Sequence, residues 1–189
     1  MSIREWWAKP WAKNLVFFGI LGTLFFTDIG TWITVKYTAW SLDEPSYIEA
    51  GKASESLYRF DIELTDIHGQ QVRLADYEGN VVFLNLWASW CVPCLAEFQG
   101  LVELQQALPE LEMIVMNVER DAEFVDFVKD TKYDLPFWRV ISPLPGLLTP
   151  QAIPASYILD AQGQVIYQFI GAADWGDPMV VAQIQKLMP

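Results

Sequence analysis

The most constraining feature of the chain is a nearly continuous apolar run, Val81–Ala88, that leads directly into two cysteines spaced three apart. Such a run, preceded by Gly79-Asn80, is typical of a strand buried on both faces of a sheet. Beyond Cys91 and Cys94, apolar residues recur at helical spacing as far as Pro109. A strand, a tight connection and a helix therefore bracket the cysteine pair.

The cysteines themselves predict redox chemistry. They are the only two in the chain, so no structural disulfide framework is available. At the start of a helix, Cys91 would lie beside unpaired backbone N–H groups, which stabilise a thiolate and suit a nucleophile. Cys94 follows almost one turn later on the same side, as a resolving thiol requires. Pro93 suits the first turn, where its missing N–H would have no partner.

A metal site is the first alternative for such a pair. Zinc needs further ligands, but the chain has no second cysteine pair and a single histidine, His68, which the pattern assigns to a turn. We therefore expect no metal and no cofactor. The alternative from another class is a non-catalytic Cu(I)-binding or docking module, although no Met- or His-rich stretch lies near the motif.

The N-terminal part of the chain carries a second long apolar segment. Residues 14–37 are 24 mainly apolar residues, which as a helix would span roughly 36 Å against a hydrocarbon core of about 30 Å. We expect a transmembrane anchor over 14–37, a cytoplasmic N-terminus over 1–13 and a linker over 38–57. A cleaved signal peptide is the competing interpretation, but signal cores have only about 7–15 apolar residues and no small-x-small cleavage site follows here.

Flanking residues give this segment an orientation. Basic residues precede it and aromatic residues flank both ends; they are Arg4, Lys9 and Lys13, then Trp6, Trp7 and Trp11, and finally Trp32, Tyr37 and Trp40. The basic residues favour an N-terminus in the cytoplasm, although Lys36 and Lys52 lie at or close behind the far end of the segment. The aromatic residues favour a span, because their rings suit the headgroup level on both sides. Asp28 is an acid inside the segment, and either it faces a partner helix or the span shifts to place it near the outer interface.

Residues 58–189 are predicted to form one α/β domain. Strands are expected over Tyr58–Thr65, Gln71–Leu74, Val81–Ala88, Leu111–Val118, Phe137–Ile141, Ala155–Asp160 and Gln164–Ile170, and helices from Cys91 to Pro109, over Asp121–Lys132, within Leu135–Ala152 and from about Asp177 to Leu187. This order predicts a central mixed sheet of about five strands with helices on both faces.

The charge of the chain excludes one class of partner. There are 24 Asp and Glu residues against 12 Lys and Arg, which gives a net charge of −12. Binding to phosphates needs a basic surface, so we expect no nucleic-acid partner.

The redox motif also carries a family resemblance. Asn85-Leu86-Trp87-Ala88-Ser89-Trp90-Cys91-Val92-Pro93-Cys94, followed by Glu97, resembles the TlpA/ResA/DsbE-type branch of the thioredoxin superfamily. The similarity is close over this block and extends more loosely from about Tyr58 to the C-terminus. It implies a thioredoxin-like fold and a thiol:disulfide oxidoreductase activity.

The resemblance also implies roles for residues around the cysteines. Pro154 is expected to follow a cis peptide bond and to face the cysteine pair, and the backbone of Ile153 is expected to pair with a bound substrate. Trp90 is given a role in shaping this substrate site. Glu97 is implicated as the proton acceptor for Cys94, because the strand position where thioredoxins keep a buried Asp holds Asn85 here. The alternative for Glu97 is a favourable partner of the helix dipole.

Location and direction follow from these expectations. We expect a single-pass protein of a bacterial inner membrane, with its catalytic domain in the periplasm, that reduces disulfides in exported proteins and is recharged by a DsbD-like membrane electron donor. A disulfide oxidase or isomerase is the alternative, since the same thiols run either way. Val92-Pro93 between the cysteines is similar to reducing members. Members that serve cytochrome c maturation tend to have an acid after the cis-proline, whereas this chain has Ala155.

Overall fold

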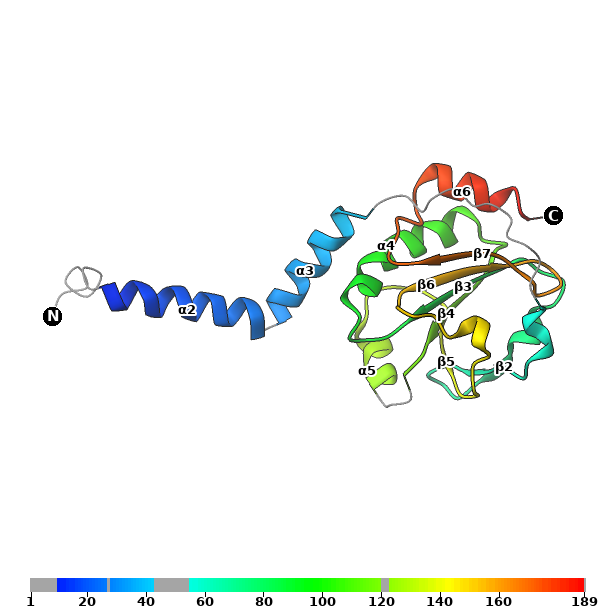
Figure 1. Ribbon diagram of the computed structural model, residues 1–189, viewed down its shortest axis with the longest axis horizontal. Coiled ribbons are helices and arrows are strands. Elements are labelled where there is room, and N and C mark those ends of the chain that lie inside the picture. Colours follow the sequence, from blue (N-terminus) through cyan, green and yellow to red (C-terminus); the bar gives the residue numbers. More distant parts are fainter. Residues whose placement is uncertain (1–9, 27, 43–54, 120–122, 189) are drawn as a thin grey trace.

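The computed structural model describes residues 10–26, 28–42, 55–119 and 123–188. Its α/β domain is built on one mixed sheet with the strand order β2-β1-β5-β4-β3-β6-β7 (Figure 1). The strands are β1 (Glu63–Thr65), β2 (Gln71–Arg73), β3 (Val82–Trp87), β4 (Glu112–Asn117), β5 (Phe137–Val140), β6 (Ala155–Leu159) and β7 (Val165–Ile170). The sheet therefore has seven strands where about five were expected, because the short β1–β2 hairpin joins it through antiparallel pairing of β1 with β5.

The central strand β3 is the apolar run recognised in the sequence. All six of its residues are buried. It pairs in parallel with β4 and antiparallel with β6, so it has neighbours on both sides. Continuous apolar character is what such a position requires, since both faces of the strand are covered.

Three α-helices cover one face of the sheet. They are α4 (Val92–Ala107), α5 (Glu123–Asp130) and α6 (Pro178–Gln185). Their buried side chains form one cluster with alternate residues of the strands, including Phe83 and Trp87 of β3. Asp177 caps α6, as predicted, and accepts hydrogen bonds from the backbone N–H groups of Met179 and Val180. The predicted cap Asp121 lies outside the described residues.

The opposite face corrects the expectation of helices on both sides. Its buried cluster is closed by short 3-10 helices, η1 (Leu57–Arg59), η2 (Leu74–Tyr77) and η3 (Gly146–Leu148), each of which contributes one leucine. The strand predicted over Tyr58–Thr65 was therefore too long, because its first residues form η1. Alternation of apolar residues cannot separate a strand from a single 3-10 turn that buries one side chain.

The turn of the β1–β2 hairpin lies where the sequence placed it. Gly69 has a φ of 83°, and the Asp66 carboxylate accepts hydrogen bonds from the N–H groups of His68 and Gln70. His68 is exposed in this turn. It is therefore a turn residue and takes no part in the redox site.

Two helices precede the domain. They are α2 (Pro10–Phe26) and α3 (Asp28–Trp40), and they form an arm beside the α/β domain (Figure 1). In the described part of the chain, neither these nor the other helices combine the length and apolar character that crossing a membrane demands. Residues 1–9, most of the expected linker (43–54), and the side chains of Asp28 and Trp32 lie outside what the structure describes.

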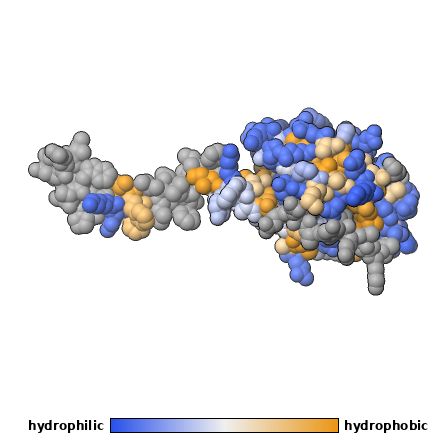
Figure 2. Space-filling model, turned by 90° about the horizontal axis from the view of Figure 1, so that it is seen from above, coloured by the Kyte–Doolittle hydropathy of each residue, from blue (hydrophilic) through white to orange (hydrophobic). Residues whose placement is uncertain are grey.

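The domain surface matches the charge of the sequence. In the view of Figure 2, hydrophilic residues dominate the domain and apolar ones are scattered among them.

The globular unit begins before Tyr58, since Leu57 is fully buried and its N–H donates to the carbonyl of Gly163.

Candidate active site

Two segments that are distant in the sequence meet at one end of the strands of the sheet. In the antiparallel pair of β3 and β6, Leu86 lies opposite Ala155 and Asn85 lies opposite Ser156. The chain that leaves β3 toward Cys91 therefore meets the chain that enters β6 from Pro154. This register places the cysteine pair and the proline at the same end of the paired strands β3 and β6.

Cys91 and Cys94 form a disulfide at the start of α4, with their Cα atoms 5.3 Å apart. Cys91 is the N-cap residue of the helix, and its Sγ accepts a hydrogen bond from the backbone N–H of Cys94 at 3.3 Å. Pro93 lies in the first turn, as predicted. Cys91 is 4% exposed and Cys94 fully buried, so of the two sulfurs Cys91 is the one within reach of a substrate.

The Ile153–Pro154 peptide bond is cis, as the resemblance implies. The carbonyl oxygen of Ile153 lies 3.7 Å from Cys91 Sγ. Ile153 is partly buried, while Trp90 next to Cys91 is 68% exposed. The structure thus places Trp90, Ile153 and Pro154 around the sulfur that a substrate would meet.

Glu97 is a fully buried acid three residues after Cys94 on the same helix. Residues three apart are neighbours on a helix surface. Its Oε1 accepts a hydrogen bond from Asn85 Nδ2 at 2.8 Å. Its Oε2 accepts from Trp175 Nε1 at 3.0 Å and from the backbone N–H of Ala173 at 3.3 Å. Glu97 is therefore more than a partner of the helix dipole, because its carboxyl is held inside the core.

Burial dominates the ionisation of this carboxyl. Removal from water raises the pKa of Glu97 to about 8, and the hydrogen bonds from Asn85, Trp175 and Ala173 act in the opposite direction by stabilising the carboxylate. A carboxyl that titrates near neutral pH can take up and release a proton under working conditions.

Asn85 links this acid to β6. Its Nδ2 also donates to Ser156 Oγ at 3.0 Å. Its Oδ1 is buried and has no hydrogen-bond partner among the residues that the structure describes. An amide in this position can offer a donor to a carboxylate or, after turning, an acceptor to a carboxylic acid.

A second acid fixes the loop before the cysteines. Glu119 follows β4, and its carboxylate accepts hydrogen bonds from Ser89 N–H at 2.8 Å and Ser89 Oγ at 3.0 Å. Asn117 Nδ2 donates to the same carboxylate at 2.8 Å. Ser89 lies in the turn in which the N–H of Cys91 donates to the carbonyl of Ala88. Glu119 thereby holds the segment that presents Trp90 and Cys91.

Sequence reasoning missed Glu119 and most hydrogen-bond partners in the two networks. The missed residues are Glu119 with its donors Ser89 and Asn117, the Glu97 donors Ala173 and Trp175, and Ser156, which accepts from Asn85. A signal existed for two of them, since Asn117 ends the strand that follows the redox helix and Glu119 lies two residues beyond it. The carboxyl ends of parallel strands lie at the same end of a sheet. Trp175 stands in a segment of small and acidic residues with no period, which gives no sign of what it contacts.

Comparison with known proteins agrees with this geometry. The model of the AhpC/TSA family matches residues 59–168. Thiol-disulfide oxidoreductase ResA of a Bacillus cereus strain is 31% identical over 132 residues, which cover 67% of this chain and 74% of that protein. Thioredoxin-like protein YneN of Bacillus subtilis (strain 168) is 30% identical over 137 residues, or 69% of this chain and 80% of YneN.

Solved structures support the fold. The pneumococcal exposed lipoprotein thioredoxin Etrx1 from Streptococcus pneumoniae strain TIGR4 matches with a TM-score of 0.56 and 24% identity, over 67% of this chain and 99% of that one. The family model covers more than half of the chain, and its matched range contains the cysteine pair, Glu97 and the cis-proline. The chain therefore belongs to the AhpC/TSA family within the thioredoxin superfamily, and it is a thiol:disulfide oxidoreductase with Cys91 and Cys94 as its redox pair.

Proposed function

We propose that this oxidoreductase is a membrane-anchored reductase that acts on disulfides of exported proteins outside the cytoplasm. The observation that carries its chemistry is the hydrogen bond from the Cys94 N–H to Cys91 Sγ at the N-cap of α4. In the reduced enzyme the same N–H and the helix dipole would stabilise a Cys91 thiolate. The thiolate is the form that attacks disulfides.

The reaction runs in two displacements. The Cys91 thiolate attacks one sulfur of the substrate disulfide, forms a mixed disulfide and expels the other substrate sulfur as a thiolate, which takes a proton from water. Cys94 then gives its proton to Glu97 and attacks Cys91 Sγ, which releases the second substrate thiolate. The substrate gains two electrons and the enzyme ends as the Cys91–Cys94 disulfide.

Substrate binding is assigned to the residues around Cys91. The exposed ring of Trp90 offers an apolar surface beside the sulfur. The backbone of Ile153 next to the cis-proline would pair with an extended substrate segment. The substrate class assigned here is disulfide-bearing proteins in general, in line with the thiol-disulfide oxidoreductases that the chain resembles.

Membrane anchoring is assigned to residues 14–37. Large apolar side chains on α2 and α3 are exposed, namely Trp11, Leu15, Phe17, Phe18, Ile33, Tyr37 and Trp40. Exposed apolar surface of this extent on two helices that precede the α/β domain suits contact with lipid. A domain held outside the cytoplasm lies in an oxidising compartment, so it would need a DsbD-like membrane donor to return its disulfide to two thiols.

Direction is tested by the reduction potential of the Cys91–Cys94 pair. The full chain is equilibrated against glutathione or dithiothreitol buffers, and the fraction of free thiols is measured by alkylation and mass. A potential near or below about −270 mV, the value for thioredoxin, is expected of a reductase. A potential toward about −120 mV, as in DsbA, would contradict the reducing direction and favour a disulfide oxidase.

A further inference from the structure

The segment that follows β7 lies unusually close to the redox helix. An added Cβ at Gly100 of α4 would meet the backbone nitrogens of Trp175 and Gly176 at 3.0 and 3.1 Å. It would also meet Oδ1 of Asp174 at 3.2 Å. The missing side chain at Gly100 therefore lets this segment approach the helix one turn beyond Glu97.

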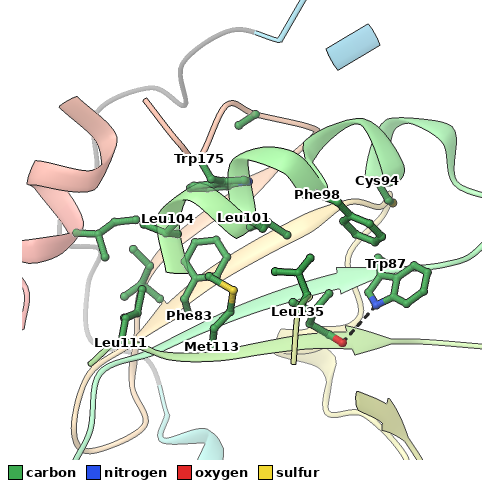
Figure 3. Close-up of a cluster of buried hydrophobic side chains, with 14 of the residues drawn as sticks. Phe83, Trp87, Cys94, Phe98, Leu101, Leu104, Leu111, Met113, Leu135 and Trp175 are labelled. Atoms are coloured by element: carbon green, nitrogen blue, oxygen red, sulfur yellow. Dashed lines mark hydrogen bonds between the residues drawn. The ribbon is translucent and has the colours of Figure 1, made fainter. Parts of the chain in front are cut away.

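This approach brings two N–H donors to one carboxylate oxygen. Trp175 Nε1 and the backbone N–H of Ala173 both donate to Glu97 Oε2. The indole of Trp175 is fully buried. Its ring makes edge contacts with Phe83 and Phe169, with centroids 4.9 and 6.0 Å away, so its orientation is fixed by packing. Figure 3 shows the indole alongside α4, next to the ring of Phe83.

We propose that Trp175 is a positioning residue of the exchange reaction, whose indole N–H holds the Glu97 carboxylate in the form and place that accept the Cys94 proton. The proposal rests on the proton-accepting role proposed for Glu97. An indole N–H can only donate a hydrogen bond, so it favours the carboxylate over the carboxylic acid. Burial has the opposite effect, and the donors keep enough carboxylate present for Cys94 to be deprotonated.

Few other groups around Glu97 could stabilise its carboxylate form. On α4 the titratable neighbour is Cys94, and on the segment after β7 it is Asp174, which is exposed and accepts a hydrogen bond from the N–H of Gly176. The strands β3 and β6 contribute the neutral Asn85 and Ser156. Trp175 is thus one of three donors to the acid, and the one whose side chain can be changed with its packing largely kept.

The test compares Trp175→Phe with Trp87→Phe in the full chain. Trp87 is the matched control, because it is also fully buried in the same cluster and its indole donates instead to the carbonyl of Val115 at 3.3 Å (Figure 3). The mixed disulfide of Cys91 with thionitrobenzoate is prepared from reduced enzyme, and the rate of thionitrobenzoate release by Cys94 is followed against pH.

Trp175→Phe should move the midpoint of this pH profile upward by about one pH unit and slow release roughly tenfold at pH 7. Trp87→Phe should leave the midpoint unchanged. Equal midpoints for the two variants would overturn the proposal. If Trp175→Phe does not fold, Gly100→Ala decides, because it displaces the segment and keeps the indole; an unshifted midpoint in a folded Gly100→Ala would likewise overturn it.

Glu97→Gln separates this inference from the function beneath it. A midpoint that is the same in Glu97→Gln and in the wild type would show that Glu97 is not the proton acceptor, and the proposed role would fail. A midpoint that moves in Glu97→Gln but is identical in the two tryptophan variants would leave Glu97 as the acceptor and remove only Trp175.

Discussion

Asn85 Nδ2 and Glu97 Oε1 lie 2.8 Å apart, so a buried hydrogen bond joins the strand that enters the redox motif to the helix that leaves it. The resemblance of the motif implies that Asn85 occupies the position where thioredoxins keep a buried acid. In this chain the buried acid is Glu97 on α4, and the position on β3 holds Asn85, its hydrogen-bond partner. This buried ionisable carboxyl therefore lies on the redox helix, three residues after Cys94.

The first prediction concerns the two cysteines. Cys91→Ser should abolish exchange, because Cys94, the only other cysteine in the sequence, is fully buried. Cys94→Ser should still attack but should accumulate mixed disulfides, since the resolving sulfur is gone. Non-reducing gels and mass spectrometry with a model disulfide peptide measure both outcomes. Full turnover in either variant would contradict the two-step mechanism.

The second prediction concerns pH and stability. The folded pKa of Glu97 is about 8 against an ordinary value of 4.5, so between these values the folded protein holds a proton that unfolding releases. The oxidised protein should therefore lose stability as pH rises through this window. Glu97→Gln should remove that loss and be more stable at pH 8, by about 4 kcal/mol. Its new amide can also donate to the unpaired Asn85 Oδ1.

Denaturant unfolding of both proteins at pH 5 and pH 8 measures this difference. Other carboxyls titrate alike in the two proteins, so the comparison isolates residue 97. Parallel stability curves across the window would show that Glu97 does not hold an extra proton in the folded state.

The fold around the cysteines could be predicted because its signals are local. The buried run of β3, the spacing of Cys91 and Cys94, and the cap of α6 at Asp177 each follow from a few adjacent residues, and each agrees with the structure. The cis peptide before Pro154 required the family resemblance, because composition and spacing do not reveal an isomer.

The network behind the site could not be predicted, because it joins residues far apart in sequence. Trp175 reaches Glu97 across 78 positions and does so only because Gly100 leaves room for the segment. Glu119 reaches Ser89 across 30 positions. Such pairs depend on the register of β3 with β4 and on loop paths, which one sequence does not specify. On the second face, the short helix expected within Leu135–Ala152 is confirmed as η3, whereas η1 and η2 were missed because one turn is too short to show a period.

The third prediction concerns the clamp formed by Glu119. Glu119→Ala leaves the N–H and hydroxyl of Ser89 without their acceptor, so it should lower the free energy of unfolding by about 1 to 3 kcal/mol. It should also slow exchange, because the turn that presents Trp90 and Cys91 is released. Ser89→Ala removes one of the two hydrogen bonds from Ser89 and should have a smaller effect on both quantities.

Glu110→Ala is the matched control for this clamp. Glu110 is an exposed acid just before β4, so its loss changes the charge equally without touching the redox loop. Denaturant unfolding and stopped-flow exchange with a model disulfide measure the variants. If Glu119→Ala and Glu110→Ala behave alike, the clamp does not support the redox loop.

The last prediction concerns the anchor, and the cysteines themselves serve as its probe. If residues 14–37 hold the chain in the inner membrane, the protein should remain in the membrane pellet after alkaline carbonate washing, and its intact mass should stay at 21.6 kDa. Removal of residues 14–37 should release it from the membrane fraction.

In reduced spheroplasts a membrane-impermeant maleimide should label the wild type and fail to label a Cys91→Ser, Cys94→Ser double variant. Labelling only after lysis would place the domain in the cytoplasm, whereas labelling with a lowered mass and a soluble product would show that the segment is a cleaved signal peptide.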